Sequence, residues 1–279
     1  MIVDFHTHIF PPEVRDRRED YIRRDPTFAE MYGDPQAKIA TAEELLESME
    51  RSGVDVSVAL GFAWQDHETC VRHNVYLAAA QSRGRIIPFC TVTMADERAA
   101  REVERCARAG ARGLGELRPE SQGWELNGEP GDDLAALAER LDLPLLFHVT
   151  EPAGHDYRGK QGLRLDSFYR FAAEHPRLKL VGAHLAGGLP FFAAMPEVAQ
   201  LKPQLHMDTA GQPYLYKGDV YRQLLSLIGP DVLLFGSDFP LIAQCRQIEE
   251  IRAGIEDENA RAMVLGGNAQ RLLGLKPER

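Results

Sequence analysis

The 279-residue sequence lacks several features that would place it in a specialised class of protein. Its longest apolar stretches, such as 178–186, fall well short of the roughly 18 to 20 residues that a membrane-spanning helix needs. The first residues, 1–6, carry an acid and an imidazole where a signal peptide would have a basic flank and an apolar core. We therefore expect a cytoplasmic protein with no membrane partner.

Cysteine and clustered positive charge are also scarce. The formal net charge is −10, and the densest group of arginines, within 15–20, is balanced by neighbouring acids. We therefore do not expect a nucleic-acid partner, and we expect a small-molecule substrate. The cysteines form neither a C-x-x-C pair nor an evident disulfide framework, so we expect reduced, mostly structural thiols at Cys70, Cys90, Cys106 and Cys245.

The pattern of apolar residues predicts alternating strands and helices. Short runs rich in Val, Ile, Leu and Phe, bounded by turn residues, indicate buried strands, and longer amphipathic stretches between them indicate helices. The expected strands are 2–6, 54–60, 86–92, 112–117, 144–149, 178–183, 204–209 and 232–237. The expected helices are 42–52, 68–82, 96–109, 132–141, 163–174, 190–201, 220–228 and 244–255.

Eight strand–helix units of this kind fit either an open doubly wound sheet or a closed barrel. No glycine-rich phosphate loop follows the first strand, which favours the barrel. We expect an α/β fold in which residues 1–279 form a single (β/α)8 TIM-barrel domain. Residues 10–40 are an insertion after strand 1, interpreted as a lid, a substrate loop or a plain surface excursion, and 259–273 predict an extra C-terminal helix.

Residues with metal-binding side chains end several of the predicted strands. In a barrel, catalytic groups gather at the C-terminal ends of the strands. A buried strand end that carries an imidazole or a carboxylate is costly unless water, a partner or a metal compensates it. The residues in question are His6 and His8, which share one side of the first strand with Asp4, together with Glu116, His148, His184 and Asp238.

Imidazole and carboxylate ligands suit Zn²⁺, Mn²⁺, Ni²⁺ or Fe²⁺, and the absence of cysteine ligands argues against a closed structural zinc site. The sequence therefore predicts an open catalytic centre for one or two divalent ions, Zn²⁺ first among them. Three other histidines, His67, His73 and His175, lie in predicted helices or at their ends, where we expect surface or capping roles.

The set His6-Thr7-His8, His148, His184 and Asp238 resembles the metal-ligand set of the amidohydrolase superfamily of (β/α)8 barrels. The segments DFHTHIFPPEV, FGSDFP and NAQRLLGL resemble more specifically amidohydrolase-related family 2, which includes the aminocarboxymuconate-semialdehyde decarboxylases and their hydrolytic relatives. This resemblance covers residues 2 to about 274. It implies that His6, His8, His148 and Asp238 hold a metal, that Asp238 also handles the proton of a metal-bound water, and that His184 binds a second metal or acts as an acid.

Glu116 is the residue on which the predicted reaction depends. The resemblance implies a bridging carboxylated lysine or a glutamate on strand four in many hydrolases of the superfamily, whereas single-metal decarboxylases generally lack that ligand. We therefore expect a metal-dependent hydrolase that activates water to cleave a C–O or C–N bond in a small, carboxylate-bearing lactone or amide. The alternative is a zinc-dependent decarboxylase of an aromatic or muconate-type acid, and a catalytically silent scaffold is disfavoured because every expected ligand is present. Glu116 also remains open to a role as an acid beside the ligands or as a partner of Arg118.

Three further residues are candidate substrate contacts. Arg118 lies just beyond strand four, where a guanidinium could hold a carboxylate with two hydrogen bonds, although pairing with Glu116 or Glu120 is an equal alternative. His155 lies in the long polar loop after strand five, and Trp64 follows strand two, where it could form an aromatic wall or simply pack. Asp208, near the end of strand seven, is placed to orient a liganding histidine. A homo-oligomer is left open.

Overall fold

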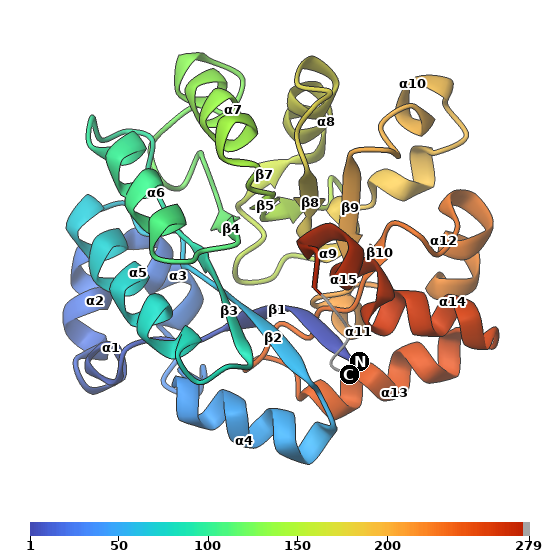
Figure 1. Cartoon of the computed structure of the whole chain (residues 1–279), viewed down its shortest axis with the longest axis horizontal. Helices are drawn as coiled ribbons and strands as arrows, with labels where there is room; N and C mark the ends of the chain where they lie inside the picture. Colours follow the sequence, from blue (N-terminus) through green and yellow to red (C-terminus); the bar gives the residue numbers. More distant parts are fainter. Residues whose placement is uncertain (276–279) are drawn as a thin grey trace.

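The computed structural model describes residues 1–275. Its core is an eight-stranded sheet in the order β1-β2-β3-β4-β5-β8-β9-β10, with every pair of neighbours parallel (Figure 1). The strands are β1 (Val3–His8), β2 (Val56–Leu60), β3 (Ile86–Cys90), β4 (Gly113–Leu117), β5 (Leu145–Phe147), β8 (Leu180–Gly182), β9 (Leu205–Asp208) and β10 (Leu233–Leu234).

The ring is closed by β1 and the segment that follows β10. The Phe5 N–H donates to the Phe235 carbonyl at 2.7 Å, and the His8 N–H donates to the Phe239 carbonyl at 2.7 Å. The chain is therefore the (β/α)8 barrel that the sequence predicts.

Helices alternate with the strands and surround the sheet (Figure 1). The expected helix over 42–52 begins with the capping box of Thr41 and Glu44 and ends at Gly53, whose φ of 66° suits glycine. The main outer helices are α4 (Ala42–Ser52), α5 (His67–Gln81), α6 (Ala99–Arg108), α7 (Glu129–Leu141), α8 (Leu165–Glu174), α12 (Val220–Ile228) and α13 (Gln244–Gly254). No helix among residues 1–275 has the length and apolar character needed to cross a bilayer.

The prediction of a single helix over 190–201 is wrong. The structure has short pieces there and just before, α9 (Ala183–Ala186), η1 (Leu189–Phe192) and α10 (Pro196–Ala199), and a further short helix, α11 (Gln212–Leu215), follows β9. Gly187 and Gly188, both at positive φ, end α9, and Pro196 begins α10 because proline has no N–H to continue a preceding helical turn.

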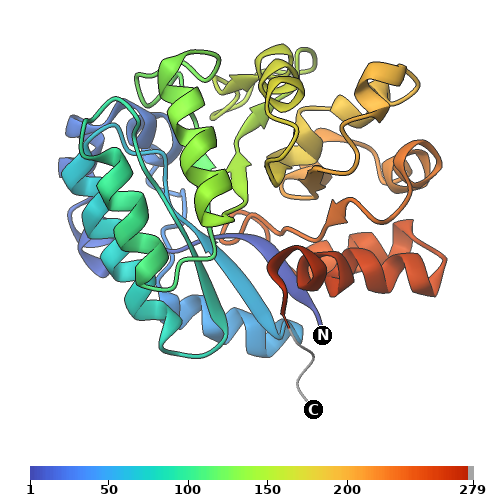
Figure 2. The same cartoon turned by 45° about the horizontal axis from the view of Figure 1, so that its top comes forward.

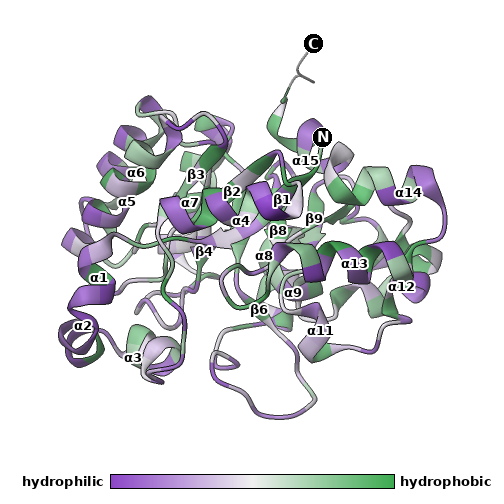
Figure 3. Cartoon of the chain, turned by 90° about the horizontal axis from the view of Figure 1, so that it is seen from below, coloured by the Kyte–Doolittle hydropathy of each residue, from purple (hydrophilic) through white to green (hydrophobic). Residues whose placement is uncertain are grey.

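The side chains of the strands divide between two apolar layers. One fills the barrel interior, and the larger one lies between the sheet and the outer helices, while hydrophilic residues concentrate on peripheral elements such as α1 and α2 (Figure 3). Burying each large apolar side chain contributes roughly 1.5–3 kcal/mol to stability. The interior layer consists of Val3, Phe5, Val58, Leu60, Phe89, Leu146, Val181, Ala183, Leu234, Ala269 and Leu273.

The last helical segments cover the end of the barrel at which the strands begin. They are α14 (Glu258–Ala262), the π-helical turn η2 (Met263–Gly267) and α15 (Asn268–Leu273), so the expected extra helix is present but divided. The side chains of Ala269 and Leu273 reach the interior layer, and α15 lies beside the N-terminus (Figure 2). The opposite, carboxyl end of the strands is therefore the end that carries the polar strand-end residues.

The insertion over 10–40 forms α1 (Pro12–Asp16), α2 (Arg18–Arg24) and α3 (Pro26–Tyr32). The carboxylate of Asp25 accepts a hydrogen bond from the Phe28 N–H at 2.8 Å and so caps α3. These helices pack on residues that follow β1 and β2 through a buried aromatic cluster, which we define as Phe10, Phe28, Tyr32, Phe62 and Trp64. A small pair of strands, β6 (Val149–Thr150) and β7 (Leu163–Arg164), borders the polar loop after β5.

Candidate metal centre

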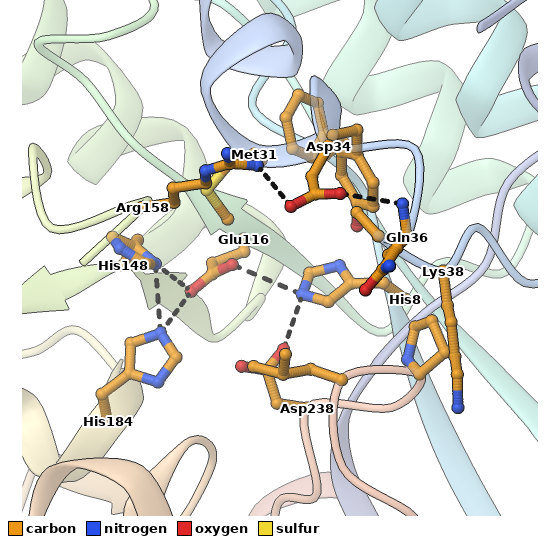
Figure 4. Close-up of a pocket in the computed structure, with 15 residues that line it drawn as sticks. His8, Met31, Asp34, Gln36, Lys38, Glu116, His148, Arg158, His184 and Asp238 are labelled. Atoms are coloured by element: carbon orange, nitrogen blue, oxygen red, sulfur yellow. Dashed lines mark hydrogen bonds and ion pairs between the residues drawn. The ribbon is translucent and has the colours of Figure 1, made fainter.

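The six predicted metal ligands meet at the carboxyl end of the barrel. Five of them line a cavity of about 400 Å³, and Figure 4 shows these five directed toward one another. The sixth, His6, is fully buried beside His8. They come from five strands or from the turns that directly follow them: His6 and His8 from β1, Glu116 from β4, His148 after β5, His184 after β8 and Asp238 after β10.

His6, His8 and Asp238 form the first group of potential ligands. The Nε2 atoms of His6 and His8 are 3.1 Å apart. Oδ1 of Asp238 lies 3.7 Å from Nε2 of His6 and 3.6 Å from Nε2 of His8. Three donor atoms that face one another in this way can share one ion.

Glu116, His148 and His184 form the second group. Oε1 of Glu116 is 2.8 Å from Nδ1 of His148 and 3.4 Å from Nε2 of His184. The other carboxylate oxygen, Oε2, lies 3.5 Å from Nε2 of His8 and 3.8 Å from Nε2 of His6. Glu116 therefore faces both groups, and His148, which the resemblance places with His6 and His8, lies in the group with Glu116.

Hydrogen bonds on the outer side of three imidazoles fix which nitrogen faces the centre. Nδ1 of His6 donates to the Asp208 carboxylate at 2.8 Å, and Nδ1 of His184 donates to the carbonyl of Ala210 at 3.0 Å. Nε2 of His148 donates to the carbonyl of Gly159 at 2.9 Å. Each ring then presents its other nitrogen, without a proton in the neutral form, to the centre, as metal-ligating histidines do.

Asp208 has the orienting position that its place near the end of a strand suggested. Its Oδ1 also accepts hydrogen bonds from the backbone N–H groups of His184 and Ala210, both at 3.0 Å. The contacts from the carbonyls of Gly159 and Ala210 could not be anticipated, because every residue has a carbonyl and only the tertiary fold decides where it points.

The backbone at two of the strand ends bends sharply. His184 has a φ of 56° and Asp238 a φ of 61°, in the left-handed region that few residues other than glycine adopt. For ordinary residues that conformation is about 1–2 kcal/mol unfavourable, so its presence at two potential ligands fits a site where side-chain position matters more than local backbone preference.

The prediction that Asp4, His6 and His8 share one side of β1 is wrong for Asp4. The register of β1 against β2 shifts between Asp4 and Thr7, which breaks the strict alternation of side chains. Asp4 instead accepts hydrogen bonds from Ser237 and from Gln244 of α13. Burial raises the pKa of its carboxyl to about 6, although these hydrogen bonds oppose the shift.

The charges at the centre are strongly coupled. Burial alone would lower the pKa of His6, but Asp208 and Glu116 outweigh it and raise that pKa to about 9. Burial would also lower the pKa of His184, but Glu116 and Asp238 outweigh it and raise that pKa to about 10. Burial would raise the pKa of Glu116, yet His148 and His6 hold it well below its usual value. Buried carboxylates that hold neighbouring imidazoles in their charged form provide a site that a divalent cation fits.

His8 gives a second indication that the centre suits a divalent cation. Its Nδ1 is buried and has no hydrogen-bond partner among residues 1–275, while its Nε2 faces the first group. An imidazole so placed lacks the partners that a structural histidine would have. The donor set of this centre therefore suits a divalent metal ion rather than a network of hydrogen bonds.

The predicted substrate contacts do not lie in the cavity wall. Arg118 is buried and pairs with Glu30 of α3 at 3.0 Å, and it also donates to the carbonyl of Gly159 at 3.1 Å. Trp64 belongs to the aromatic cluster, and its indole N–H donates to Nδ1 of His73 at 3.0 Å. His155 is exposed in the loop after β5. Their roles toward a substrate stay predictions.

Two of the histidines expected at the surface are buried instead. His73 is 2% exposed and His67 is 7% exposed. Nε2 of His73 donates to the carbonyl of Ile9 at 2.7 Å, so this ring joins the helix α5 to the chain that leaves β1. Helical periodicity did not reveal this, because α5 is covered on one side by the insertion.

Comparison with known proteins agrees with the resemblance. A family model described as Amidohydrolase matches residues 3–275, and the chain belongs to this family. Its fold is similar to that of 5-carboxyvanillate decarboxylase LigW from Sphingomonas paucimobilis, with a TM-score of 0.80, 20% identity and 99% of each chain covered. It is also similar to a dihydroxybenzoic acid decarboxylase from Polaromonas with bound manganese and the inhibitor 2-nitroresorcinol, with a TM-score of 0.75, 19% identity and 99% and 98% of the two chains covered.

A third similar structure is the manganese complex of 5-carboxyvanillate decarboxylase from Novosphingobium aromaticivorans, with a TM-score of 0.79, 18% identity and 99% and 96% coverage. These comparisons contradict the prediction of a lactone or amide hydrolase, because the three similar proteins are decarboxylases, two of them with bound manganese. The prediction relied on Glu116. A carboxylate among buried imidazoles is equally explained by charge balance, so its presence does not specify the activation of water.

Proposed function

We propose that the protein is a divalent-metal-dependent decarboxylase that removes CO₂ from an aromatic or muconate-type carboxylic acid. The observation that carries this proposal is the position of the ligand groups beneath a largely apolar cavity, in a fold shared with such decarboxylases. The cavity walls include Met31, Tyr32, Phe62, Pro240 and Leu241. A flat organic acid fits this arrangement, with its ring against the apolar walls and its carboxylate at the polar floor.

We assign the ion, Zn²⁺ or Mn²⁺, to His6, His8 and Asp238. When bound, such an ion supplies a positive charge that binds a carboxylate and a neighbouring oxygen and stabilises negative charge on the substrate. Asp208 holds the ring of His6 in position through the 2.8 Å hydrogen bond to Nδ1. The apolar residues of the wall, such as Met31 and Phe62, would contact the ring of such an acid.

Decarboxylation breaks a C–C bond, releases CO₂ and leaves an electron pair on carbon that must take up a proton. His184 is the residue that we assign to this delivery. Its Nδ1–H is held by the carbonyl of Ala210, so the proton that it can give up is the one on Nε2, next to the cavity. A general acid must lie within hydrogen-bond reach of the atom that it protonates, and His184 lines the cavity in which we place that atom.

The test of the reaction is a panel of carboxyl-labelled acids. The metal-loaded protein is expected to release labelled CO₂ from at least one of 5-carboxyvanillate, 2,6-dihydroxybenzoate or a muconate-type semialdehyde acid, measured by ¹³C NMR of the carbonate pool. Lactones and amides of similar size serve as the comparison and should remain intact. Opening of a lactone or amide, with no CO₂ released from any acid, would show that the proposal is wrong.

The number of ions per chain provides a separate prediction. We expect about one tightly held divalent ion per chain, retained in Glu116→Gln, because the closest contact of Glu116 is to His148 and not to the first group. Elemental analysis of the reconstituted proteins measures this directly. Two ions per chain, falling to one in Glu116→Gln, would contradict the assignment of a single ion to His6, His8 and Asp238.

A further inference from the structure

Tyr32, at the end of α3, is a polar side chain of the cavity that neither the sequence nor the comparisons assign to the site. The residue is 9% exposed and lines the cavity together with His8, Glu116 and Asp238. Its hydroxyl forms no hydrogen bond within residues 1–275 and is not among their fully buried polar atoms, so it remains accessible from the cavity. A ligand in the cavity is the natural partner for this group.

The ring of Tyr32 is held firmly, which fixes where its hydroxyl can lie. It stacks on Phe28 with 4.9 Å between ring centroids, and it meets Phe10 edge-on at 5.2 Å and Phe62 edge-on at 5.7 Å. Aromatic pairs at these separations stabilise one another beyond the area that they bury. The insertion therefore presents one fixed phenol to the cavity.

The hydroxyl of Tyr32 is protonated at neutral pH, since an ordinary phenol has a pKa of about 10. At neutral pH the group is therefore a hydrogen-bond donor. This donor lines the same cavity as the candidate metal ligands, where an anionic substrate would bring its oxygens.

The cations near the cavity are less well placed for this task. Arg158 and Lys38 also line the cavity, but Arg158 is exposed and pairs with Asp34 at 3.2 Å, an ion pair that Figure 4 draws. Arg118 is engaged with Glu30 and with the carbonyl of Gly159. Lys38 is exposed and also borders a separate surface groove next to Arg18.

We propose that Tyr32 is a substrate-binding residue whose hydroxyl donates a hydrogen bond to an anionic oxygen of a hydroxylated aromatic acid. This inference rests on the proposed function, since it names the substrate group that the site recognises. It makes the insertion a part of the substrate site, with one phenol that selects an oxygen-bearing ring over a purely hydrocarbon one.

The test compares Tyr32→Phe with Tyr21→Phe. Tyr21 is a matched control, because it comes from the same insertion and its ring also packs against Phe28 and Trp64, yet it does not line the cavity. The probe is 2-nitroresorcinol, whose absorbance reports binding to the metal-loaded protein. A hydrogen bond to an anion corresponds to an increase in Kd of about 10- to 100-fold in Tyr32→Phe, against less than about twofold in Tyr21→Phe.

Turnover supplies the second measurement. With any acid of the panel that loses CO₂, Tyr32→Phe should lower kcat/KM mainly through KM, and the loss should shrink for an analogue in which the ring hydroxyl is replaced by hydrogen. Equal Kd values for Tyr32→Phe and the unaltered protein would overturn the role of Tyr32, as would an unaltered protein that fails to bind the probe. Loss of probe binding in Tyr32→Phe without any decarboxylation by the unaltered protein would support Tyr32 while refuting the proposed function.

Discussion

Replacement of Asp238 by asparagine is expected to lower kcat/KM for decarboxylation by roughly 10³-fold while the barrel stays folded. Oδ1 of Asp238 lies within 3.7 Å of Nε2 in both His6 and His8, so the change removes a negative charge from the group that we assign to the ion. Asparagine has the same size and is one of the few residues that tolerate the left-handed backbone found here, with its φ of 61°. The effect should therefore be chemical rather than structural.

Asp142→Asn is the matched control for this experiment. Asp142 follows α7, has a similar φ of 54°, and pairs with Lys179 at 2.6 Å on the surface. Its replacement should leave both turnover and the thermal midpoint nearly unchanged, because exposed ion pairs contribute little. If Asp238→Asn turned over substrate at nearly the unaltered rate, with Asp142→Asn behaving as expected, the role assigned to Asp238 would be wrong.

The helices and strands followed closely from the sequence wherever packing and local preference agree. The bounds of α4 and α12 match the expected helices, since each has an apolar face toward the barrel. Prediction failed where glycine and proline divided the chain after β8, and on β1, where a register shift turned Asp4 away from the histidines. A register shift depends on the neighbouring strand and leaves no mark in the sequence of β1 itself.

The candidate ligands could be predicted because barrel topology gathers the carboxyl ends of all strands on one side. Distant residues such as His6 and Asp238 thus become neighbours once eight strands are recognised. The cavity wall could not be predicted in this way. Arg118 finds its partner Glu30 at a distance of 88 residues in the sequence, and Tyr32 reaches the cavity only because the aromatic cluster folds the insertion over the barrel.

The choice between hydrolysis and decarboxylation lies beyond the ligand set. The same imidazoles and carboxylates can serve either reaction, because both need positive charge beside a carboxylate or carbonyl oxygen. What distinguishes them is the substrate that the cavity admits and the atom that receives a proton. Those features depend on wall residues such as Met31 and Tyr32, which come from an insertion without regular sequence pattern.

Removal of the divalent ion is expected to abolish decarboxylation, with turnover restored by Mn²⁺ or Zn²⁺ but not by Mg²⁺. The donor atoms of His6 and His8 are imidazole nitrogens, which suit transition metals and zinc better than Mg²⁺. Activity measured after chelation and after re-addition of each ion tests this. Full turnover in protein shown by elemental analysis to be free of metal would contradict the proposed chemistry.

Rebinding of the ion should also release protons. In the metal-free site the pKa of His6 is raised to about 9, so at pH 7 this ring holds a proton that an ion at Nε2 must displace. Calorimetric titrations in buffers of different ionisation enthalpy should therefore show the release of about one proton per ion. Asp208→Asn removes the negative charge that contributes most to keeping His6 protonated. It should lower both the number of protons released and the affinity for the ion.

The raised pKa values of His6 and His184 also determine how the stability of the metal-free protein depends on pH. A histidine whose pKa rises on folding stabilises the protein fully below its unfolded value of 6.5 and loses that contribution as the pH passes its folded value, about 9 for His6 and about 10 for His184. Metal-free protein should thus lose thermal stability between about pH 7 and pH 10. In metal-loaded protein the ion takes the place of the proton on His6, so its thermal midpoint should fall less over this range. Parallel pH profiles with and without the ion would mean that His6 does not bind it.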